Sequence, residues 1–215
     1  MLISDSHAFI FVQMRKVAST SMQSILRPLC LERPAGRLVH LKSRARLEWD
    51  YRRYLFRTHD DILAAKRRMS AEKFQRYFKF AFVRNPWSRL VSEYEYILRQ
   101  PEHGRHARVV RLGSFSEFIR MQIPRREAYQ LNMLCDSSGE LLTDFVGKLE
   151  NLQNDWQIVC ERIGIRCELL PPRNVTQHDD YREYFSGEDV QLVAKHWARE
   201  IDQFDYSFAE DGPAG

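Results

Sequence analysis

Short apolar runs alternate with amphipathic stretches along this chain, and the alternation predicts an α/β fold. Residues 8–12 (AFIFV) and 78–83 (FKFAFV) are apolar runs of strand length bounded by polar residues, a pattern typical of buried strands. A weaker run at 143–146 predicts a further strand. Apolar residues at helical spacing predict helices over residues 19–29, 86–98, 152–163 and 190–204. Strands that alternate with helices favour an α/β domain with a short, largely parallel central sheet flanked by helices.

Several polar residues and glycines predict where these helices begin and end. Asn85 can cap a helix whose first residue is a proline, a position at which the missing N–H is no loss. Ser114 and Glu117 have the spacing of a capping box, and Ser186 is a further candidate cap. Gly164 follows an apolar stripe and predicts the C-terminus of that helix.

The composition is that of one ordinary globular domain. The chain has 215 residues, of which 44% are hydrophobic and 29% charged, and a typical domain uses about 150 residues. We therefore expect a single domain over residues 1–215. No apolar run approaches the roughly 20 residues of a membrane span. The start (MLISDSHAFIFVQMRK) lacks the basic region and cleavage site of a signal peptide, which favours a soluble, cytoplasmic protein.

Cysteine usage gives no sign of a metal centre. Cys30, Cys135, Cys160 and Cys167 form no C-x-x-C pair, and the chain contains no H-E-x-x-H. The usual spacings of zinc sites and redox motifs are therefore absent. We expect four reduced thiols and no metal site.

Charge is distributed unevenly, although the net charge is only +4. Residues 33–76 contain thirteen Lys and Arg against five Asp and Glu, a local charge of +8. Residues 179–215 contain three basic and ten acidic residues, a local charge of −7. Two solvated helical faces of opposite sign would explain this pattern. A basic wall for an anionic partner, such as a polyanionic substrate or a nucleic acid, would explain it as well.

The segment 11–22 (FVQMRKVASTSM) has the order strand, tight loop, helix. A helix N-terminus presents unpaired N–H groups and a partial positive charge, so it binds phosphate-like anions. Lys16 adds a full charge, and Ser19, Thr20 and Ser21 add hydroxyl donors at the first helical turn. This is phosphate-loop architecture without the glycines of a Walker motif. A Ser/Thr-capped helix that merely follows a strand is the alternative.

A second segment, residues 80–94 (FAFVRNPWSRLVSEY), again places a cation and hydroxyl groups where a predicted strand leads into a helix. Arg84 leaves the predicted strand, and Ser88 and Ser92 share one face of the following helix by i,i+4 spacing. A guanidinium at a strand end and a hydroxyl on the next helix can together grip a second phosphate. A surface arginine and a helix-packing serine would give the same pattern.

Together the two segments resemble the paired signature of sulfotransferases that use 3′-phosphoadenosine 5′-phosphosulfate (PAPS). The similarity is greatest to the carbohydrate type, which includes heparan 2-O- and chondroitin 4-O-sulfotransferases and their bacterial relatives. The order and spacing of KVASTSM and FVRNPWSRLVSEY carry the resemblance. Later segments support it more weakly: residues 144–156 (DFVGKLENLQNDW), residues 170–188 (LPPRN…YREYFSGE) and residues 199–208 (REIDQFDYSF).

The resemblance implies a P-loop-like fold, a donor and a role for each matching residue. It implies PAPS as co-substrate, with no metal, bound at the C-terminal edge of the sheet. Loop 14–22 would hold the 5′-phosphosulfate, and motif 82–94 would hold the 3′-phosphate that distinguishes PAPS from ATP. Lys16 would face the bridging oxygen and stabilise charge on the leaving group. The implied donor-binding residues are Arg15, Lys16, Val17, Ala18, Ser19, Thr20, Ser21, Arg84, Ser92 and, by a looser match, Arg173.

Sulfuryl transfer also needs a base that takes the proton of the attacking hydroxyl. His59, in RTHDDIL, stands where heparan 2-O-type relatives carry a histidine assigned as base, and imidazole titrates near neutral pH. Its acidic neighbours suggest instead a residue at the start of a helix. His40, Asp60 and Glu48 remain alternative bases.

These features predict a bacterial-type enzyme that transfers a sulfuryl group from PAPS to a carbohydrate hydroxyl. The basic segment 33–76 contains His59, which favours an anionic glycan, such as an acidic polysaccharide, as acceptor. Nucleic acid is not expected as a partner. A nucleotide kinase and a non-catalytic polyanion-binding module remain alternatives. The kinase would lack its Walker glycines, and the binding module would leave both ordered motifs unexplained.

Overall fold

A four-stranded sheet forms the centre of the molecule. The computed structural model describes residues 1–30, 56–170 and 180–209. The strands lie in the order β1-β2-β3-β4; β2 pairs in parallel with β3, and β3 in parallel with β4, while β1 is antiparallel to β2. Their bounds are β1 Leu2–Ser4, β2 Phe9–Val12, β3 Phe78–Val83 and β4 Phe145–Lys148. The predicted α/β domain with a mostly parallel sheet is therefore confirmed, with one antiparallel edge strand added.

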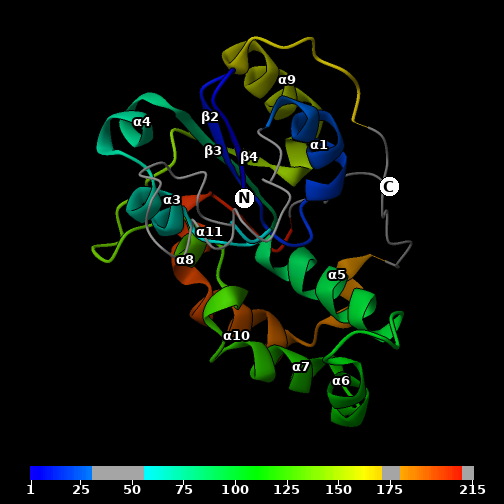
Figure 1. Cartoon of the computed structure of the whole chain (residues 1–215). Coiled ribbons are helices and arrows are strands. Elements are labelled where there is room, and N and C mark those ends of the chain that lie inside the picture. The colour runs from blue at the N-terminus through cyan, green and yellow to red at the C-terminus, as the bar shows by residue number, and fades with distance from the viewer. Residues whose placement is uncertain (31–55, 171–179, 210–215) are drawn as a thin grey trace, which may run out of the picture.

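Helices connect and cover these strands. The α-helices are α1 Ser19–Leu26, α3 Ile62–Arg68, α4 Ala71–Arg76, α5 Pro86–Leu98, α6 His106–Leu112, α7 Phe115–Gln122, α8 Leu131–Leu134, α9 Leu152–Ile163, α10 Gly187–His196 and α11 Ala198–Gln203. The short 3-10 turns are η1 Arg27–Leu29, η3 Arg126–Ala128, η4 Leu149–Asn151 and η5 Tyr181–Tyr184. In Figure 1, α1 and α9 lie on one side of the sheet, and α3 and α8 lie on the other.

Two hydrophobic cores result from this arrangement. The first is built on the sheet, where all four residues of β2 are buried against α1, α3, α8 and α9. The second joins α5, α6, α7 and α10 around Trp87, Phe118 and Trp197. Figure 1 shows these four helices gathered together away from the sheet. Helix α5 connects the two cores, because it begins at the end of β3 and continues into the helical cluster.

The predicted caps form as hydrogen bonds. Asn85 Oδ1 accepts from the Trp87 N–H at 3.1 Å, and Ser114 Oγ accepts from the Glu117 N–H at 3.2 Å. Ser186 forms a full capping box with the third residue of α10. Side chains of this kind stabilise a helix by roughly 1 kcal/mol each.

Several predicted bounds differ from the structure. The helix predicted over 19–29 ends as α1 at Leu26 and continues as the 3-10 turn η1, and the strand predicted over 8–12 begins at Phe9. The predicted helix over 190–204 is two helices, because the backbone leaves helical geometry at Trp197 (φ −102°, ψ 17°). There the indole Nε1 donates to the Ala128 carbonyl at 3.0 Å, and the ring stacks on Tyr129. The strand predicted at 143–146 runs instead from 145 to 148. It includes Gly147, where the Phe82 ring occupies the space of a side chain: a Cβ added there would lie 2.6 Å from the ring.

Candidate anion-binding site

The loop between β2 and α1 is shaped by two left-handed residues. Lys16 has φ +65° and Ala18 has φ +55°, a conformation that costs an L-residue about 1–2 kcal/mol. The Ser19 hydroxyl donates to the Met14 carbonyl and ties the start of α1 back to the strand. Ala18, at the N-cap position, has no side-chain oxygen with which to cap α1. The Ser21 N–H donates to the Ala18 carbonyl at 3.0 Å, so the N–H groups of Ser19 and Thr20 are the ones suited to an external anion.

The remaining predicted loop residues differ in exposure. Val17 and Ser21 are buried as whole residues, whereas Arg15 and Thr20 are exposed. The hydroxyls predicted to act together thus separate in the structure. The Ser19 hydroxyl bonds to the loop backbone, Ser21 is buried, and Thr20 is open to solvent.

Lys16 is half-buried and lies against an aromatic ring. Its Nζ sits 4.1 Å from the centre of the Tyr96 ring, a cation–π contact. Burial, with a further contribution from Arg84, lowers the pKa of Lys16 to about 8, while Glu93 opposes the shift. A cation whose charged form is disfavoured by its surroundings gains from the approach of an anion.

Arg84 joins the second motif to the loop. Its Nε donates to Ser88 Oγ at 2.9 Å, and its Nη1 donates to the Lys16 carbonyl at 3.4 Å. Burial lowers the pKa of Arg84 to about 10, against the opposing charge of Glu150. The carboxyl ends of the parallel strands β2 and β3 thus bring two desolvated cations to one edge of the sheet, as is usual for ligand sites of α/β proteins.

The serine that binds Arg84 is Ser88. Ser92, grouped with Arg84 from the sequence, lies one turn further along the same helix face and is buried. The spacing of Ser88, Ser92 and Tyr96 places all three on one face of α5. Sequence reasoning did not single out Tyr96 as a contact of Lys16, although this i, i+4, i+8 periodicity could have pointed to it.

His59 lies beside the strand that leads into the loop. Its Nδ1 is 2.9 Å from the Gln13 carbonyl oxygen. Since a carbonyl can only accept, Nδ1 carries the proton of the neutral ring, and Nε2 holds a lone pair that can act as a base. Partial desolvation, opposed by this hydrogen bond and assisted by Arg15, lowers the pKa of His59, although part of the residue is exposed to solvent. The imidazole is therefore kept neutral near pH 7.

The acidic neighbours of His59 are used structurally. Asp61 caps α3 by accepting from the Ala64 N–H at 2.9 Å, and Asp60 pairs with Arg68 at 3.2 Å. These contacts leave His59 the better oriented of the two candidate bases that the structure describes. The alternatives His40 and Glu48, the loosely matched Arg173 and most of the basic segment 33–76 lie outside the described residues.

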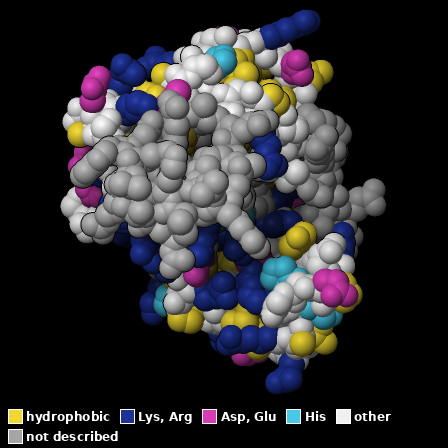
Figure 2. Space-filling model, viewed as in Figure 1, with side chains coloured by type: hydrophobic (Ala, Val, Ile, Leu, Met, Phe, Trp, Pro, Cys, Tyr) yellow, Lys and Arg dark blue, Asp and Glu magenta, His cyan; other side chains and the backbone are white. Residues whose placement is uncertain are grey.

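Glu93 of α5, whose charge acts on Lys16, forms buried ion pairs with two arginines. Glu93 contacts Arg105 and lies 3.9 Å from Arg89, and both arginines hold the pKa of Glu93 below its ordinary value although burial alone would raise it. Arg15 and Arg125 act on the same group of charges. In Figure 2, Lys and Arg side chains gather in the lower half of the face.

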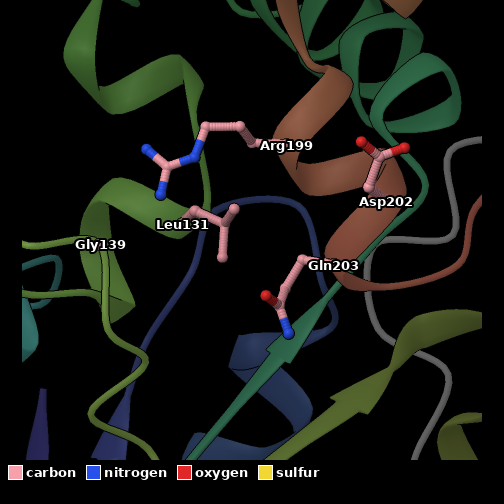
Figure 3. Close-up of a pocket in the computed structure, with 5 residues that line it drawn as sticks. All are labelled: Leu131, Gly139, Arg199, Asp202 and Gln203. Atoms are coloured by element: carbon pink, nitrogen blue, oxygen red, sulfur yellow. The ribbon is translucent and has the colours of Figure 1, made fainter.

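A separate pocket of about 390 Å³ lies beside α11. Figure 3 shows Arg199, Asp202 and Gln203 of α11 around it, together with Leu131 and Gly139. None of the predicted site residues that the structure describes lines this pocket, so it does not belong to the candidate site.

Within residues 1–30, 56–170 and 180–209, no group of three or more His, Cys, Asp or Glu side chains is arranged to hold a metal ion. Over these residues, no helix combines the length and the apolar character that crossing a bilayer requires.

The sheet, the strand–loop–helix anion site and the second cation at the neighbouring strand end define a P-loop-like α/β protein. A profile of the Sulfotransferase family matches residues 1–207, and the chain belongs to that family. It is 27% identical to carbohydrate sulfotransferase 14 of Danio rerio over 201 residues, which cover 82% of this chain and 51% of that protein. The chain thus spans about half the length of this relative. The resemblance to carbohydrate sulfotransferases predicted from the sequence is confirmed.

A second relative extends the comparison to archaea. The chain is 30% identical over 120 residues to an uncharacterized protein of Archaeoglobus fulgidus, and the match covers 55% of this chain and 93% of that protein. The family and the relative from Danio rerio together support a transferase that acts by sulfuryl transfer.

Proposed function

We propose that this protein transfers a sulfuryl group from PAPS to a hydroxyl of a carbohydrate acceptor. The observation that carries the proposal is the hydrogen bond from Arg84 to the Lys16 carbonyl, which links the two anion motifs at one edge of the sheet. PAPS has anionic groups at both its 5′ and 3′ positions. Two neighbouring cations, each with a pKa lowered by burial, supply one positive partner for each of these anionic groups.

Each motif takes one end of the donor in this proposal. Arg84 and Ser92, with Ser88 as a further partner, bind the 3′-phosphate. The loop binds the 5′-phosphosulfate through the backbone N–H groups at the start of α1, the Thr20 hydroxyl and Lys16. To do so, Lys16 Nζ leaves the Tyr96 ring and turns into the loop. The other donor-binding residues are Arg15, Val17, Ala18, Ser19 and Ser21, with Arg173 by resemblance.

The transfer is an in-line displacement in which atoms and charge balance. The acceptor oxygen forms a bond to sulfur while the bond between sulfur and the bridging phosphate oxygen breaks, releasing 3′-phosphoadenosine 5′-phosphate (PAP). The proton of the acceptor hydroxyl passes to Nε2 of His59. Lys16 stabilises the negative charge that develops on the departing phosphate oxygen. His59 thus supplies the base, and Lys16 supplies the electrostatic stabilisation.

An anionic glycan is the acceptor class that the surface favours. Exposed Arg15 lies near His59, and Arg125 acts on the same group of charges. Cations beside the base attract the uronic acid or sulfate groups of a polysaccharide, whereas a neutral sugar gains no such attraction. The apparent KM for the acceptor therefore rises with salt, because surface charges are screened beyond about 8–10 Å at ionic strengths of 0.1–0.15 M. Cytoplasmic location and a bacterial type stay predictions.

Thermal stabilisation by three ligands tests the proposal. The protein is heated with PAP, with ATP and Mg²⁺, and with heparin, each at the same molar excess over protein. Binding to the native state raises the unfolding temperature. A shift with PAP that ATP and Mg²⁺ do not match supports the sulfotransferase. A shift with ATP and Mg²⁺ alone identifies a kinase, and a shift with heparin alone identifies a polyanion-binding module.

A further inference from the structure

The side-chain amide of buried Gln130 forms hydrogen bonds with both backbone groups of Arg84, as a residue of a neighbouring strand would. The Arg84 N–H donates to Gln130 Oε1 at 2.9 Å, and Gln130 Nε2 donates to the Arg84 carbonyl at 2.9 Å. Both backbone groups of one residue are thus paired with one side-chain amide. Gln130 comes from the segment before α8, 46 positions away in the chain. Its side chain is almost completely buried, with 2% exposed.

Glu200 of α11 fixes the orientation of that amide. One carboxylate oxygen accepts from Gln130 Nε2 at 3.2 Å, and the other accepts from the Leu131 N–H at 3.1 Å. Because a carboxylate only accepts, the amide must present its nitrogen to Glu200 and its oxygen to the Arg84 N–H. Glu200 is itself buried, with 1% exposed. A buried charge of this kind is costly unless its hydrogen bonds are made.

The backbone of the next residue, Asn85, is held by a second side chain, Glu150. The Asn85 N–H donates to Glu150 Oε1 at 2.8 Å, and Tyr206 Oη donates to Glu150 Oε2 at 3.2 Å. The backbone at the end of β3 is therefore clamped by Gln130, just before α8, and by Glu150 of η4, which is itself held by Tyr206. The position of the Arg84 guanidinium depends on this clamp, since rotation about the Arg84 backbone would move the guanidinium away from Lys16 and Ser88.

We propose that Gln130, oriented by Glu200, is a positioning residue that sets the selectivity of the site for a ligand bearing a 3′-phosphate. This inference rests on the proposed function, in which Arg84 binds that phosphate. Gln130 contacts the backbone of Arg84 and leaves its guanidinium available. Its loss therefore misplaces Arg84 without removing the charge, and it weakens the 3′-phosphate contact more than the 5′ contacts.

The test compares the affinities of PAP and adenosine 5′-monophosphate (AMP), which lacks the 3′-phosphate, by calorimetry. Gln130→Met keeps the size of the side chain and removes both hydrogen bonds to Arg84 and the one to Glu200. The matched control is Gln122→Met: Gln122 is also buried, and within the described ranges neither of its amide atoms has a hydrogen-bond partner. We expect the Kd of PAP to rise about 10-fold in Gln130→Met. The Kd of AMP changes less than about 2-fold, and the control keeps the wild-type ratio.

A second variant, Glu200→Gln, keeps the shape of the carboxylate but leaves one acceptor oxygen for two donors, the Gln130 amide and the Leu131 N–H. It lowers the preference for PAP in the same direction, and it decides the outcome if Gln130→Met does not fold. A PAP-to-AMP ratio unchanged in the variants that fold overturns the role of Gln130. Equal affinity of the wild type for PAP and AMP is a different result, because it contradicts the proposed function itself.

Discussion

The carboxyl ends of β2 and β3 lie side by side, yet they are held by different means. The end of β2 is shaped within its own segment by left-handed residues at 16 and 18 and by the Ser19 hydroxyl. The end of β3 is held from outside by Gln130 and Glu150, which come from distant parts of the chain. The first end stores backbone strain, and the second end is a network of buried hydrogen bonds.

The two strand ends are therefore suited to different tasks, the β2 loop to a change of contacts and the end of β3 to a fixed one. In the β2 loop, Lys16 rests on Tyr96 and is free to change partners when an anion arrives. At β3, Arg84 is already oriented toward Ser88 and Lys16 before any ligand is bound. We therefore expect changes in the loop region to alter turnover most, and changes at Arg84 to alter donor affinity most.

The largest effect is expected from removal of the proposed base, His59. His59→Ala should reduce turnover by about 100- to 10,000-fold, the usual contribution of a positioned base, with little change in PAP affinity. His106→Ala is a matched control, because His106 also has its Nδ1 2.9 Å from a backbone carbonyl, that of Ile97. Because partial desolvation lowers the pKa of His59, the acidic limb of the wild-type pH–rate profile should lie below about pH 6.5. Near-normal turnover in His59→Ala would move the role to another group.

Removal of the loop cation should also act mainly on turnover. Lys16→Ala is expected to lower it by roughly 100-fold or more, because charge on the departing phosphate oxygen loses its stabilising partner. Steady-state kinetics with saturating PAPS measure this loss. Lys195→Ala, which removes an exposed lysine of α10, should leave turnover unchanged. A Lys16→Ala variant that loses only donor affinity would erase the contrast between the two strand ends.

Removal of the second cation should act on binding. Arg84→Ala is expected to weaken PAP by roughly 30- to 1,000-fold, as for the loss of a charge-assisted contact in a buried site. Adenosine 5′-phosphosulfate, which lacks the 3′-phosphate, should be affected much less. Calorimetric titration of both ligands provides the comparison. Equal losses for the two would remove Arg84 from the 3′-phosphate site.

The pH dependence of PAP affinity sharpens the comparison further. The pKa of Lys16 is lowered to about 8, and a bound anion raises it again. Below pH 8 the lysine is already charged, so affinity is nearly flat. Above pH 8 binding must take up a proton, so the Kd of PAP should rise by up to about tenfold per pH unit. The slope should disappear in Lys16→Ala and persist in Lys195→Ala; a slope that survives in Lys16→Ala would assign it to another group.

The smallest effect concerns the strain of the loop. Ala18→Gly relieves a left-handed conformation worth about 1–2 kcal/mol but adds about 0.5–1 kcal/mol of chain entropy in the unfolded state. The free energy of unfolding in urea should therefore stay equal or rise by up to about 1 kcal/mol. Ala194→Gly in α10 should lower it by about 1 kcal/mol. Equal destabilisation by both substitutions would show that the loop is not strained at Ala18.

The contrast also explains which features the sequence could predict. The loop, the caps at Asn85 and Ser114 and the position of Arg84 depend on neighbouring residues, and each was predicted. The Gln130–Glu200 pair was not, because its members are 70 positions apart and neither belongs to a local pattern. The break at Trp197 has the same cause, since the contacts of that indole with Ala128 and Tyr129 come from another segment. Tertiary packing of this kind overrides helical periodicity.

One measurement tests the central claim of sulfuryl transfer most directly. Oligosaccharides of acidic polysaccharides are incubated with the protein and either PAPS radiolabelled in its sulfuryl group or ATP radiolabelled in its γ-phosphoryl group, with and without a chelator. We expect label to reach the glycan from PAPS, to the same extent with the chelator present, and none to arrive from ATP. Label that arrives only from ATP, and only when Mg²⁺ is available, would contradict this claim.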